Sequence, residues 1–417
     1  MRILHAARNI GNQPGYLVRA LRRLGHDAEV WEYESNPFAF PADRTIDIRS
    51  GDAMVFWRTF LEAVDRFDVF HFHFGRTLFP ADWGGVPPLW DLPIYRILGK
   101  KVFATWHGSD CRIRRIHLDV NPWSYYRTSQ VQADDDRTQK VIEVFRTYAD
   151  RNFVVSPDYF HFIPDAELLP RVIDLSEWPE QAPEQRPVPR VLHVPSRRGT
   201  KGTDALMAAI EQLKRDGVAL EFELLENVPH EEARRAIQSA DVVIDNLITG
   251  DYELVSIEAM ASNRVAVANI QAESAKAFAD VPVYPVDPGN VVERLRTLIL
   301  DPELRRSLAA RGRPYVAARH DATLIARRLL DFYGAPSGPV PRRAFPDWLS
   351  LEGSRAIERL ERQLAESRHR EFALRRRLGL PVQPPNDRTL KDRLPTPLRL
   401  FLRRTRARAT KALGGRR

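Results

Sequence analysis

Short apolar runs alternate with segments of helical periodicity along the first half of the chain. Residues 2–5 form the first apolar run, and after the turn NIGNQPG apolar residues recur at helical spacing over residues 16–24, up to Gly25. Four further apolar runs predict strands, at residues 28–31, 68–72, 101–106 and 153–155. Because most of these runs are apolar throughout, we expect a parallel sheet that helices cover on both faces.

The alternation stops at a segment rich in Pro and acidic residues and then begins again. Residues 174–190 read DLSEWPEQAPEQRPVPR and have no apolar period, which is typical of a linker. Beyond them the pattern predicts helices at residues 204–213, from 230 onwards and up to 333. It predicts strands at residues 191–194, 222–225, 242–245 and 265–267.

The length agrees with two doubly wound α/β domains, because a single hydrophobic core stops growing at roughly 250 to 300 residues. The chain has 417. We expect these boundaries: a first Rossmann-like domain at 1–175, a linker at 176–189, a second such domain at 190–335 and a helical extension at 336–417.

The extension differs from the domains in both pattern and charge. Apolar residues recur at three-and-four spacing in a seam that Ser367 and Glu371 interrupt, which permits a coiled-coil homodimer or a helix docked on the body. The seam consists of Ile357, Leu360, Leu364, Leu374 and Leu378. Residues 391–417 hold ten Lys or Arg and one Asp, so they carry more positive charge than the whole chain, which stands at +8.

The apolar residues of 391–417 fall along one side of a helix whose other side is basic. This predicts peripheral contact with an anionic membrane, since each Lys or Arg near such a surface contributes about 1 kcal/mol. A nucleic-acid-binding arm is the rival, but no aromatic stacking platform accompanies the charge, so we expect no nucleic acid partner. A solubilising tail is the plainest alternative.

Other features of the sequence point to a cytoplasmic protein, with the tail as its contact to the inner face of the plasma membrane. No apolar run approaches the ~20 residues of a membrane-spanning helix. The start, MRILHAARNI, lacks the pattern of a signal peptide, and Cys111 is the only cysteine, so an internal disulfide is impossible.

One basic loop has the composition of a diphosphate site. In VPSRRGTKGTDALMAAI a strand ends in a turn that holds Arg197, Arg198 and Lys201 between glycines, directly before a helix. Cations, a flexible backbone and a helix N-terminus are what hold a diphosphate, although a solvated basic turn has the same composition. Further on, DNLITGDYELVSIEAMASNRVAV places Glu258 in a helix among apolar neighbours. Its carboxylate either binds a ligand or only interacts favourably with the helix dipole.

The stretch from Lys201 to Asn269 resembles the donor half of the retaining GT-B glycosyltransferases of family 4, and the similarity extends over most of residues 1–335. The resemblance implies that Lys201 binds the donor diphosphate and that Glu258 binds the donor ribose. It also implies that the loop before Glu258 surrounds the transferred sugar and its phosphate. That loop consists of Gly250, Asp251, Tyr252, Glu253 and Leu254.

Two positions depart from the family pattern. The family places a second Glu eight residues before the ribose Glu, where this chain has Gly250, so Asp251 or Glu253 is the candidate for the missing contact. The family's phosphate-binding Arg lies five residues before the Lys, where this chain has Ser196. Arg197 or Arg198 would then take its place.

The resemblance makes His107, in FATWHGSDCR, the leading catalytic histidine, with Asp110 second; a histidine that only packs a strand end is the alternative. His71 and His73 lie on one face of a strand and, with His107, Asp110 or Cys111, have the chemistry of a zinc site. No ligand spacing supports that reading, so we expect packing, or contact between His73 and the acceptor.

The turn after the first strand resembles the loop by which these enzymes approach the acceptor and the transferred sugar, although by itself it is also an ordinary strand-to-helix turn. Its residues are Gly11, Asn12, Gln13, Gly15 and Tyr16.

We therefore expect a retaining hexosyltransferase that moves a sugar from a nucleotide diphosphate sugar, its co-substrate, to a glycan or lipid-linked acceptor in cell-surface polysaccharide or glycolipid synthesis. The resemblance implies no bound metal and no cofactor, with cations and helix dipoles offsetting the diphosphate charge. A nucleotide-sugar epimerase shares the fold and stays open, as does a degenerate transferase that acts as a partner subunit.

Overall fold

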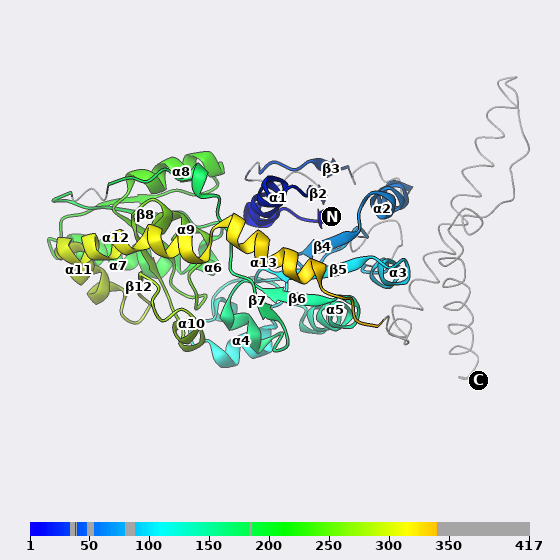
Figure 1. Ribbon diagram of the computed structural model, residues 1–417. Coiled ribbons are helices and arrows are strands. Elements are labelled where there is room, and N and C mark those ends of the chain that lie inside the picture. Colours follow the sequence, from blue (N-terminus) through cyan, green and yellow to red (C-terminus); the bar gives the residue numbers. More distant parts are fainter. Residues whose placement is uncertain (34–37, 39, 48–53, 80–87, 183–185, 340–417) are drawn as a thin grey trace, which may run out of the picture.

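The protein consists of two α/β lobes joined at a junction between their sheets (Figure 1). The computed structural model describes all residues except 34–37, 39, 48–53, 80–87, 183–185 and 340–417. The predicted extension from residue 340 onwards, with its seam and the basic tail, therefore lies outside the described residues. Within the described part, no helix is long and apolar enough to cross a membrane.

The first lobe is built on a seven-stranded parallel sheet with the order β3-β2-β1-β4-β5-β6-β7. Its strands are β1 (Arg2–Ala6), β2 (Asp27–Tyr33), β3 (Arg44–Ile46), β4 (Val69–His73), β5 (Lys101–Trp106), β6 (Arg151–Val154) and β7 (Glu167–Leu168). Its helices are α1 (Gln13–Arg23), α2 (Met54–Arg66), α3 (Leu92–Ile97), α4 (Arg114–Val120) and α5 (Asp135–Tyr148). Its described loops contain four short 3-10 helices, at Ile10–Asn12, Tyr125–Arg127, Pro157–His161 and Leu175–Glu177.

The second lobe has a five-stranded parallel sheet with the order β12-β11-β10-β8-β9. Its strands are β8 (Arg190–His193), β9 (Glu221–Leu224), β10 (Val242–Asn246), β11 (Val265–Ala268) and β12 (Val283–Pro285). Its helices are α6 (Arg198–Lys201), α7 (Thr203–Arg215), α8 (His230–Ser239), α9 (Leu254–Ala261), α10 (Ala272–Ala277), α11 (Val291–Leu300) and α12 (Pro302–Arg319).

The last described helix, α13 (Ala322–Gly334), returns to the first lobe (Figure 1). Its N-cap residue is Asp321, whose carboxylate accepts from two backbone amides, and the helix packs on α1 through Ile325, Leu329 and other apolar residues. The predicted boundary at residue 335 therefore does not follow the packing, since the second sheet and its helices end at α12.

The chain crosses between the lobes twice, and the two crossings are hydrogen-bonded to each other. The Ile173 amide donates to the His320 carbonyl at 2.9 Å, and the Ala322 amide donates to the Ile173 carbonyl at 3.0 Å. The predicted linker is partly packed rather than exposed, because Trp178 is fully buried in the core of the second lobe.

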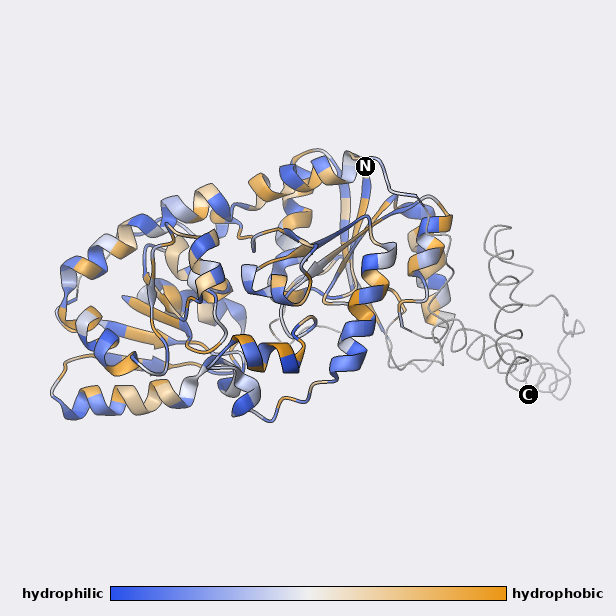
Figure 2. Ribbon diagram, turned by 90° about the horizontal axis from the view of Figure 1, so that it is seen from below, coloured by the Kyte–Doolittle hydropathy of each residue, from blue (hydrophilic) through white to orange (hydrophobic). Residues whose placement is uncertain are grey.

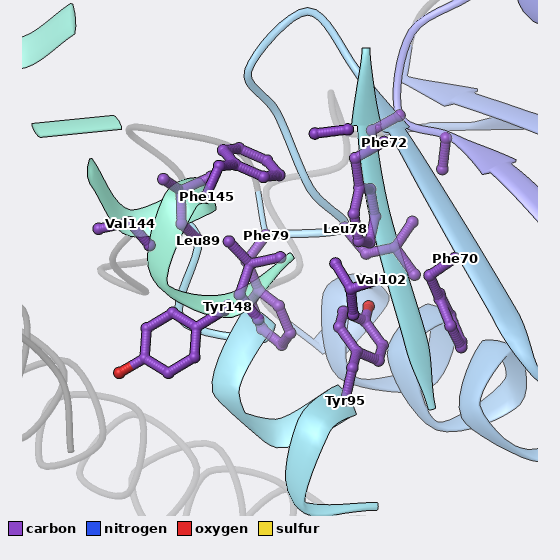
Figure 3. Close-up of a cluster of buried hydrophobic side chains, with 14 of the residues drawn as sticks. Phe70, Phe72, Leu78, Phe79, Leu89, Tyr95, Val102, Val144, Phe145 and Tyr148 are labelled. Atoms are coloured by element: carbon purple, nitrogen blue, oxygen red, sulfur yellow. The ribbon is translucent and has the colours of Figure 1, made fainter. Parts of the chain in front are cut away.

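The cores lie between each sheet and its covering helices. Figure 2 shows hydrophobic residues concentrated on the strands and on the inward faces of the helices. In the first lobe an aromatic cluster fills the space between the sheet and α3 and α5, where Tyr95 stacks on Phe70 at a centroid distance of 4.2 Å (Figure 3). Burial of β4 on both faces explains why its sequence is nearly continuous in apolar and aromatic residues.

All nine strands predicted from the sequence are present, with ends that differ from the predicted ones by at most two residues. The first helix begins earlier than expected, at Gln13, because Pro14 is tolerated in the first turn. Sequence reasoning missed the short strands β3, β7 and β12, which have two or three residues each and carry little periodic signal.

Candidate functional site

The loops that follow β1 and β10 meet where the two lobes join, and we call this region the interdomain junction. A Cβ atom at Gly11 would lie 3.4 Å from Leu254 at the start of α9, so the predicted acceptor-side loop and the predicted donor loop face each other closely. Gly11 and Asn12 both have φ of +55°, a conformation that glycine and asparagine adopt most readily. The sequence thus builds a tight turn that leaves room for the opposite lobe.

The other three residues of the acceptor-side loop are packed or hydrogen-bonded within the protein. The Gln13 side chain donates to the Val172 carbonyl at 2.9 Å and accepts from the Val172 amide at 2.7 Å, which fixes the loop to the crossing segment. Gly15 packs against Asn12, whose side-chain oxygen would lie 2.2 Å from a Cβ atom there. Tyr16 is fully buried, and both burial and the charge of Glu258 raise its pKa.

Lys201 lies at the junction as a buried cation held by two carboxylates. It ends the short helix α6, and Gly202, with φ of +76°, turns the chain into α7. The Lys201 ammonium donates to Asp245 Oδ1 at 3.0 Å and also to the Glu253 carboxylate. Burial lowers the pKa of Lys201, but the charges of Asp245 and Glu253 outweigh it, so the pKa is raised and the ammonium stays charged.

The same carboxylates organise the start of α9. Asp245 Oδ2 accepts from the Glu253 amide at 2.8 Å and from the Ser256 hydroxyl at 2.8 Å. Burial raises the pKa of Glu253, but Lys201, Arg171 and Arg112 outweigh it and lower it to about 2. Glu253 is therefore ionised and lies among three cations that come from both lobes.

The other two predicted phosphate-binding cations lie further out. Arg198 is half-exposed and pairs with Glu226 at 3.0 Å and with Asp204 at 3.6 Å. Arg197 is exposed and precedes α6. The structure thus separates Lys201, which is 7% exposed, from the two arginines beside it in sequence.

Glu258 is buried on α9 and is bound to a histidine that sequence reasoning missed. Its Oε1 lies 2.7 Å from His230 Nε2, at the start of α8. Burial lowers the pKa of His230, but the hydrogen bond and charge of Glu258 outweigh it, so the pKa is raised. The Phe40 ring packs edge-on against His230 at 5.1 Å, so this pair also faces the first lobe.

The loop before α9 explains the departure at Gly250. This residue has φ of +98°, and a Cβ atom there would lie 2.7 Å from the Gln271 side chain. The Gln271 amide group occupies the space beside the glycine, and its Nε2 is buried without a hydrogen-bond partner among the described residues. Gln271, which follows β11, is therefore a polar side chain available where the family pattern places a glutamate.

Asp251 and Tyr252 connect the loop to surrounding structure. Asp251 Oδ2 accepts from the Ser156 hydroxyl of the first lobe at 2.5 Å, and burial raises the pKa of Asp251 to about 7. The Tyr252 hydroxyl lies 3.0 Å from both Tyr315 and His320. Of the two candidates for the missing polar contact, Asp251 is thus engaged between the lobes and Glu253 is engaged with Lys201.

His107 follows β5 and faces the junction from the first lobe. Its Nε2 lies 3.0 Å from Nδ1 of His73, and burial together with Arg171 lowers the pKa of His107 to about 3. The Asp110 carboxylate accepts from the backbone amides of His107 and Gly108, the latter at 2.6 Å, and burial raises the pKa of Asp110 to about 6. Asp110 therefore shapes the loop that carries His107.

His73 is fully buried behind His107, with one nitrogen on His107 and the other on His5. In this arrangement both nitrogens are taken up by other histidines, so His73 supports His107 rather than facing an acceptor. The histidines of β4 group with His5, and the nitrogens of His5, His71 and His73 lie within 4.8 Å of one another. Cys111 instead donates to the Gly108 carbonyl at 3.3 Å.

Two buried arginines at the junction escaped the sequence reading. Arg112 pairs with Asp158 at 3.2 Å, and Arg171 donates to the Tyr252 carbonyl at 3.2 Å. The available signal was weak: Arg112 ends the HGSDCR motif, and Arg171 is a lone charge in the run LLPRVID. Together with Lys201 they place three buried cations around Glu253.

Comparison with known proteins supports the fold. Residues 205–331 match a family model described as glycosyl transferase-like, and no curated protein matches the chain. The chain is similar to sucrose-phosphate synthase from Thermosynechococcus elongatus at 16% identity and a TM-score of 0.56, covering 79% of this chain and 97% of that one.

It is also similar to Alr3699/HepE of Anabaena, in structures with UDP and with UDP-glucose, at 14% identity and a TM-score of 0.52. These matches cover 79% of this chain and 99% and 98% of the two HepE chains. Similarity at this level shows the fold alone, and it confirms the GT-B arrangement of two parallel-sheet domains.

Proposed function

We propose that this protein is a glycosyltransferase that uses a nucleotide diphosphate sugar and transfers the sugar with retention of configuration. The observation that carries the proposal is Lys201, a charged, buried ammonium at the junction of the two lobes, directly beside the start of α9. A buried cation with adjacent helix amides is suited to a diphosphate, which carries strong negative charge. The glycosyl transferase-like match over residues 205–331 covers α9 and its loop.

In the proposed donor complex, the diphosphate replaces Glu253 as a partner of Lys201. Without donor, the Lys201 ammonium is already paired with the two carboxylates of Asp245 and Glu253. Glu253 must therefore turn away before a diphosphate can approach. Arg112 and Arg171, which already act on Glu253 through their charges, provide the compensating positive charge from the first lobe.

The remaining groups fit the other parts of the donor. Glu258 takes the ribose hydroxyls, and Tyr16 of the facing lobe lies near enough for its pKa to respond to the Glu258 charge. His107 and Gln271 approach the sugar, His107 with its second ring nitrogen and Gln271 with its unpartnered amide. The acceptor oxygen then bonds to the anomeric carbon on the side from which the diphosphate leaves, and the hydroxyl proton passes to the oxygen of the departing diphosphate.

Catalysis in this scheme rests on orientation and on stabilisation of the leaving diphosphate by Lys201 and the α9 amides. His107 remains neutral, because its pKa is lowered to about 3, and so it orients a hydroxyl rather than donating a proton. We expect the cations of the protein to suffice without a metal ion. Undiminished turnover after treatment with EDTA would support this, whereas recovery only on adding Mg²⁺ or Mn²⁺ would contradict it.

The first experiment is a thermal-shift screen of nucleotide sugars that includes UDP-glucose, the ligand named with the Anabaena protein. A ligand present at a hundred times its dissociation constant adds about 2.7 kcal/mol to the stability of its binding form. The sugar nucleotide that stabilises best is then offered with candidate acceptors. Nucleoside diphosphate release that depends on an acceptor supports transfer.

Other results of this assay would contradict transfer. A changed sugar configuration without acceptor would indicate an epimerase, and strong binding with no turnover across many acceptors would indicate a partner subunit without activity.

We further propose a glycan or lipid-linked acceptor in cell-surface polysaccharide or glycolipid synthesis, reached at an anionic membrane through residues 391–417. The support is the charge of that segment, ten Lys or Arg against one Asp. A chain lacking residues 391–417 should sediment less with vesicles of anionic lipid, and neutral vesicles are the control. Equal sedimentation of both chains would contradict the membrane contact.

A further inference from the structure

A chain of hydrogen-bonded histidines runs through the first lobe and ends at the junction. Its members come from three neighbouring strands: β1 carries His5, β4 carries His73, and His107 follows β5. His107 Nε2 lies 3.0 Å from His73 Nδ1, and His73 Nε2 lies 2.9 Å from His5 Nδ1. Each bond joins two imidazoles directly, so the three rings form one continuous path from the strand interior to the site.

The path continues into the helix that returns from the second lobe. The Tyr333 hydroxyl of α13 lies 3.4 Å from His5 Nε2 and 2.5 Å from His71 Nδ1. His71 Nε2 in turn lies 2.7 Å from the Thr105 hydroxyl. His5, His71 and Tyr333 are fully buried, so their hydrogen bonds are made within the protein.

Burial keeps the histidines of this path uncharged. It lowers the pKa of His5 to about 3 and, with the neighbouring histidines, holds the pKa of His71 and of His73 well below the usual value. A neutral imidazole has one N–H donor and one acceptor nitrogen. Since each bond in the path needs one proton, choosing the donor in one bond fixes the donor in every other, and only two arrangements exist.

The Tyr333 hydroxyl selects between them. A hydroxyl carries one proton, and that of Tyr333 lies much nearer to His71 Nδ1, at 2.5 Å, than to His5 Nε2, at 3.4 Å, so the nearer nitrogen is its acceptor. Tyr333 therefore donates to His71 and accepts from His5 Nε2. The proton of His5 then lies on Nε2, that of His73 on Nε2 and that of His107 on Nε2, which leaves His107 Nδ1 as an acceptor.

We propose that Tyr333, His5 and His73 are positioning residues that hold His107 in its Nε2–H tautomer, with Nδ1 presented to accept a hydrogen bond from a substrate hydroxyl. The identity of that substrate as a sugar rests on the function proposed above, whereas the tautomer does not. The path also connects the junction to α13. Tyr333 of this helix thus acts on His107 through His5 and His73 and does not itself contact the substrate.

A metal ion is the rival use of the same residues. The nitrogens of His5, His71 and His73 are close enough together to be considered as ligands, and zinc binds histidine at about 2.0–2.1 Å. Zinc would replace the bond between His5 and His73, because it needs the lone pairs that this bond occupies. A zinc site and the hydrogen-bonded path therefore exclude each other.

Nuclear magnetic resonance of protein labelled with ¹⁵N-histidine tests the proposal directly. Long-range proton–nitrogen correlations distinguish the two neutral tautomers, and a His107→Gln variant identifies the His107 signals by their loss. We expect the Nε2–H pattern at neutral pH and less than stoichiometric zinc by elemental analysis. The Nδ1–H pattern, an imidazolium pattern or one equivalent of zinc would each overturn the proposal.

A Tyr333→Phe variant then tests the positioning role. Loss of the hydroxyl removes the group that selects the arrangement, so His107 should show both tautomers, and kcat should fall about tenfold, as loss of an oriented hydrogen bond implies. Stabilisation by the donor diphosphate alone should not change, since Lys201 is untouched. Tyr148→Phe is the matched control, because Tyr148 is buried in the aromatic core of the same lobe (Figure 3).

An unaltered His107 signal in Tyr333→Phe would contradict the role of Tyr333. The two proposals can also fail separately. A protein with the Nε2–H tautomer but no turnover would contradict the proposed function only, and a protein with transfer activity but the Nδ1–H tautomer would contradict the histidine path only.

Discussion

The ammonium of Lys201 lies 3.0 Å from the carboxylate of Asp245, at the end of β10, and both groups are almost fully buried. The second carboxylate on Lys201 is that of Glu253, which is the N-cap residue of α9 and does not belong to a strand. We expect this carboxylate to be the one that moves. The site is therefore held ready for an anion by a fixed pair and a replaceable third group.

Lys201→Met should impair both stability and donor binding. It leaves the buried carboxylate of Asp245 and the partly buried one of Glu253 without their cation, and breaking a buried pair such as Lys201–Asp245 costs about 3–5 kcal/mol. Thermal unfolding with and without UDP measures both effects, and we expect the variant to lose the shift that UDP causes. Lys214→Met, an exposed cation of α7, is the control. An undiminished UDP shift in Lys201→Met would show that the diphosphate binds elsewhere.

Glu253→Gln should have the opposite effect and raise the affinity for the diphosphate. It removes one of the two negative charges on Lys201 and keeps the shape of the side chain. We expect UDP to bind more tightly, by up to about tenfold or 1.4 kcal/mol, in isothermal titration calorimetry. Glu211→Gln, on the exposed face of α7, should leave the affinity unchanged. Weaker UDP binding in Glu253→Gln would mean that Glu253 contacts the donor instead of competing with it.

The His230–Glu258 pair should make stability depend on pH. Burial opposes the charged histidine, but Glu258 outweighs it and raises the pKa of His230 above 6.5. A raised pKa means that the folded state binds the proton more tightly, so the stabilisation is complete below the unfolded value and is lost as the pH rises through the folded one. Urea unfolding of the wild type and His230→Gln from about pH 5.5 to 8.5 should therefore show a difference that is largest at low pH. A difference that is the same at every pH would contradict the pairing.

Gly202 and Gly217 provide a comparison in which only the surroundings differ. Both have φ of +76°, but a Cβ atom at Gly202 would lie 3.0 Å from Leu247 and 3.1 Å from Ile248, whereas nothing lies within 4 Å at Gly217. Gly217→Ala should cost roughly 1–2 kcal/mol from the backbone alone. Gly202→Ala should cost about 1–3 kcal/mol more, because the loop after β10 must shift.

Chemical denaturation of the two alanine variants measures that difference. Equal losses of stability in the two variants would show that the loop after β10 shifts at no measurable cost in free energy. A larger loss at Gly202 together with a smaller UDP shift would show that the turn after α6 also fixes Lys201 for binding.

Local sequence patterns determined most of the architecture. Strands such as β4 and β5 and helices such as α7 were predictable because apolar periodicity depends only on neighbouring positions in the chain. The same patterns place Lys201, His107 and Glu258 after strands, and in the structure they follow β8, β5 and β10. Short edge strands such as β3 escaped, because three residues carry no measurable period.

The tertiary structure decided how these residues are paired. Nothing local to Lys201 shows that Asp245 and Glu253 hold it, and nothing local to Glu258 indicates His230. His5 and His107 are about a hundred positions apart, yet they share one hydrogen-bonded path because β1, β4 and β5 are neighbours in the sheet. The periodicity of a chain fixes which face of an element is buried, whereas the order of strands and the return of α13 determine which polar groups meet inside it.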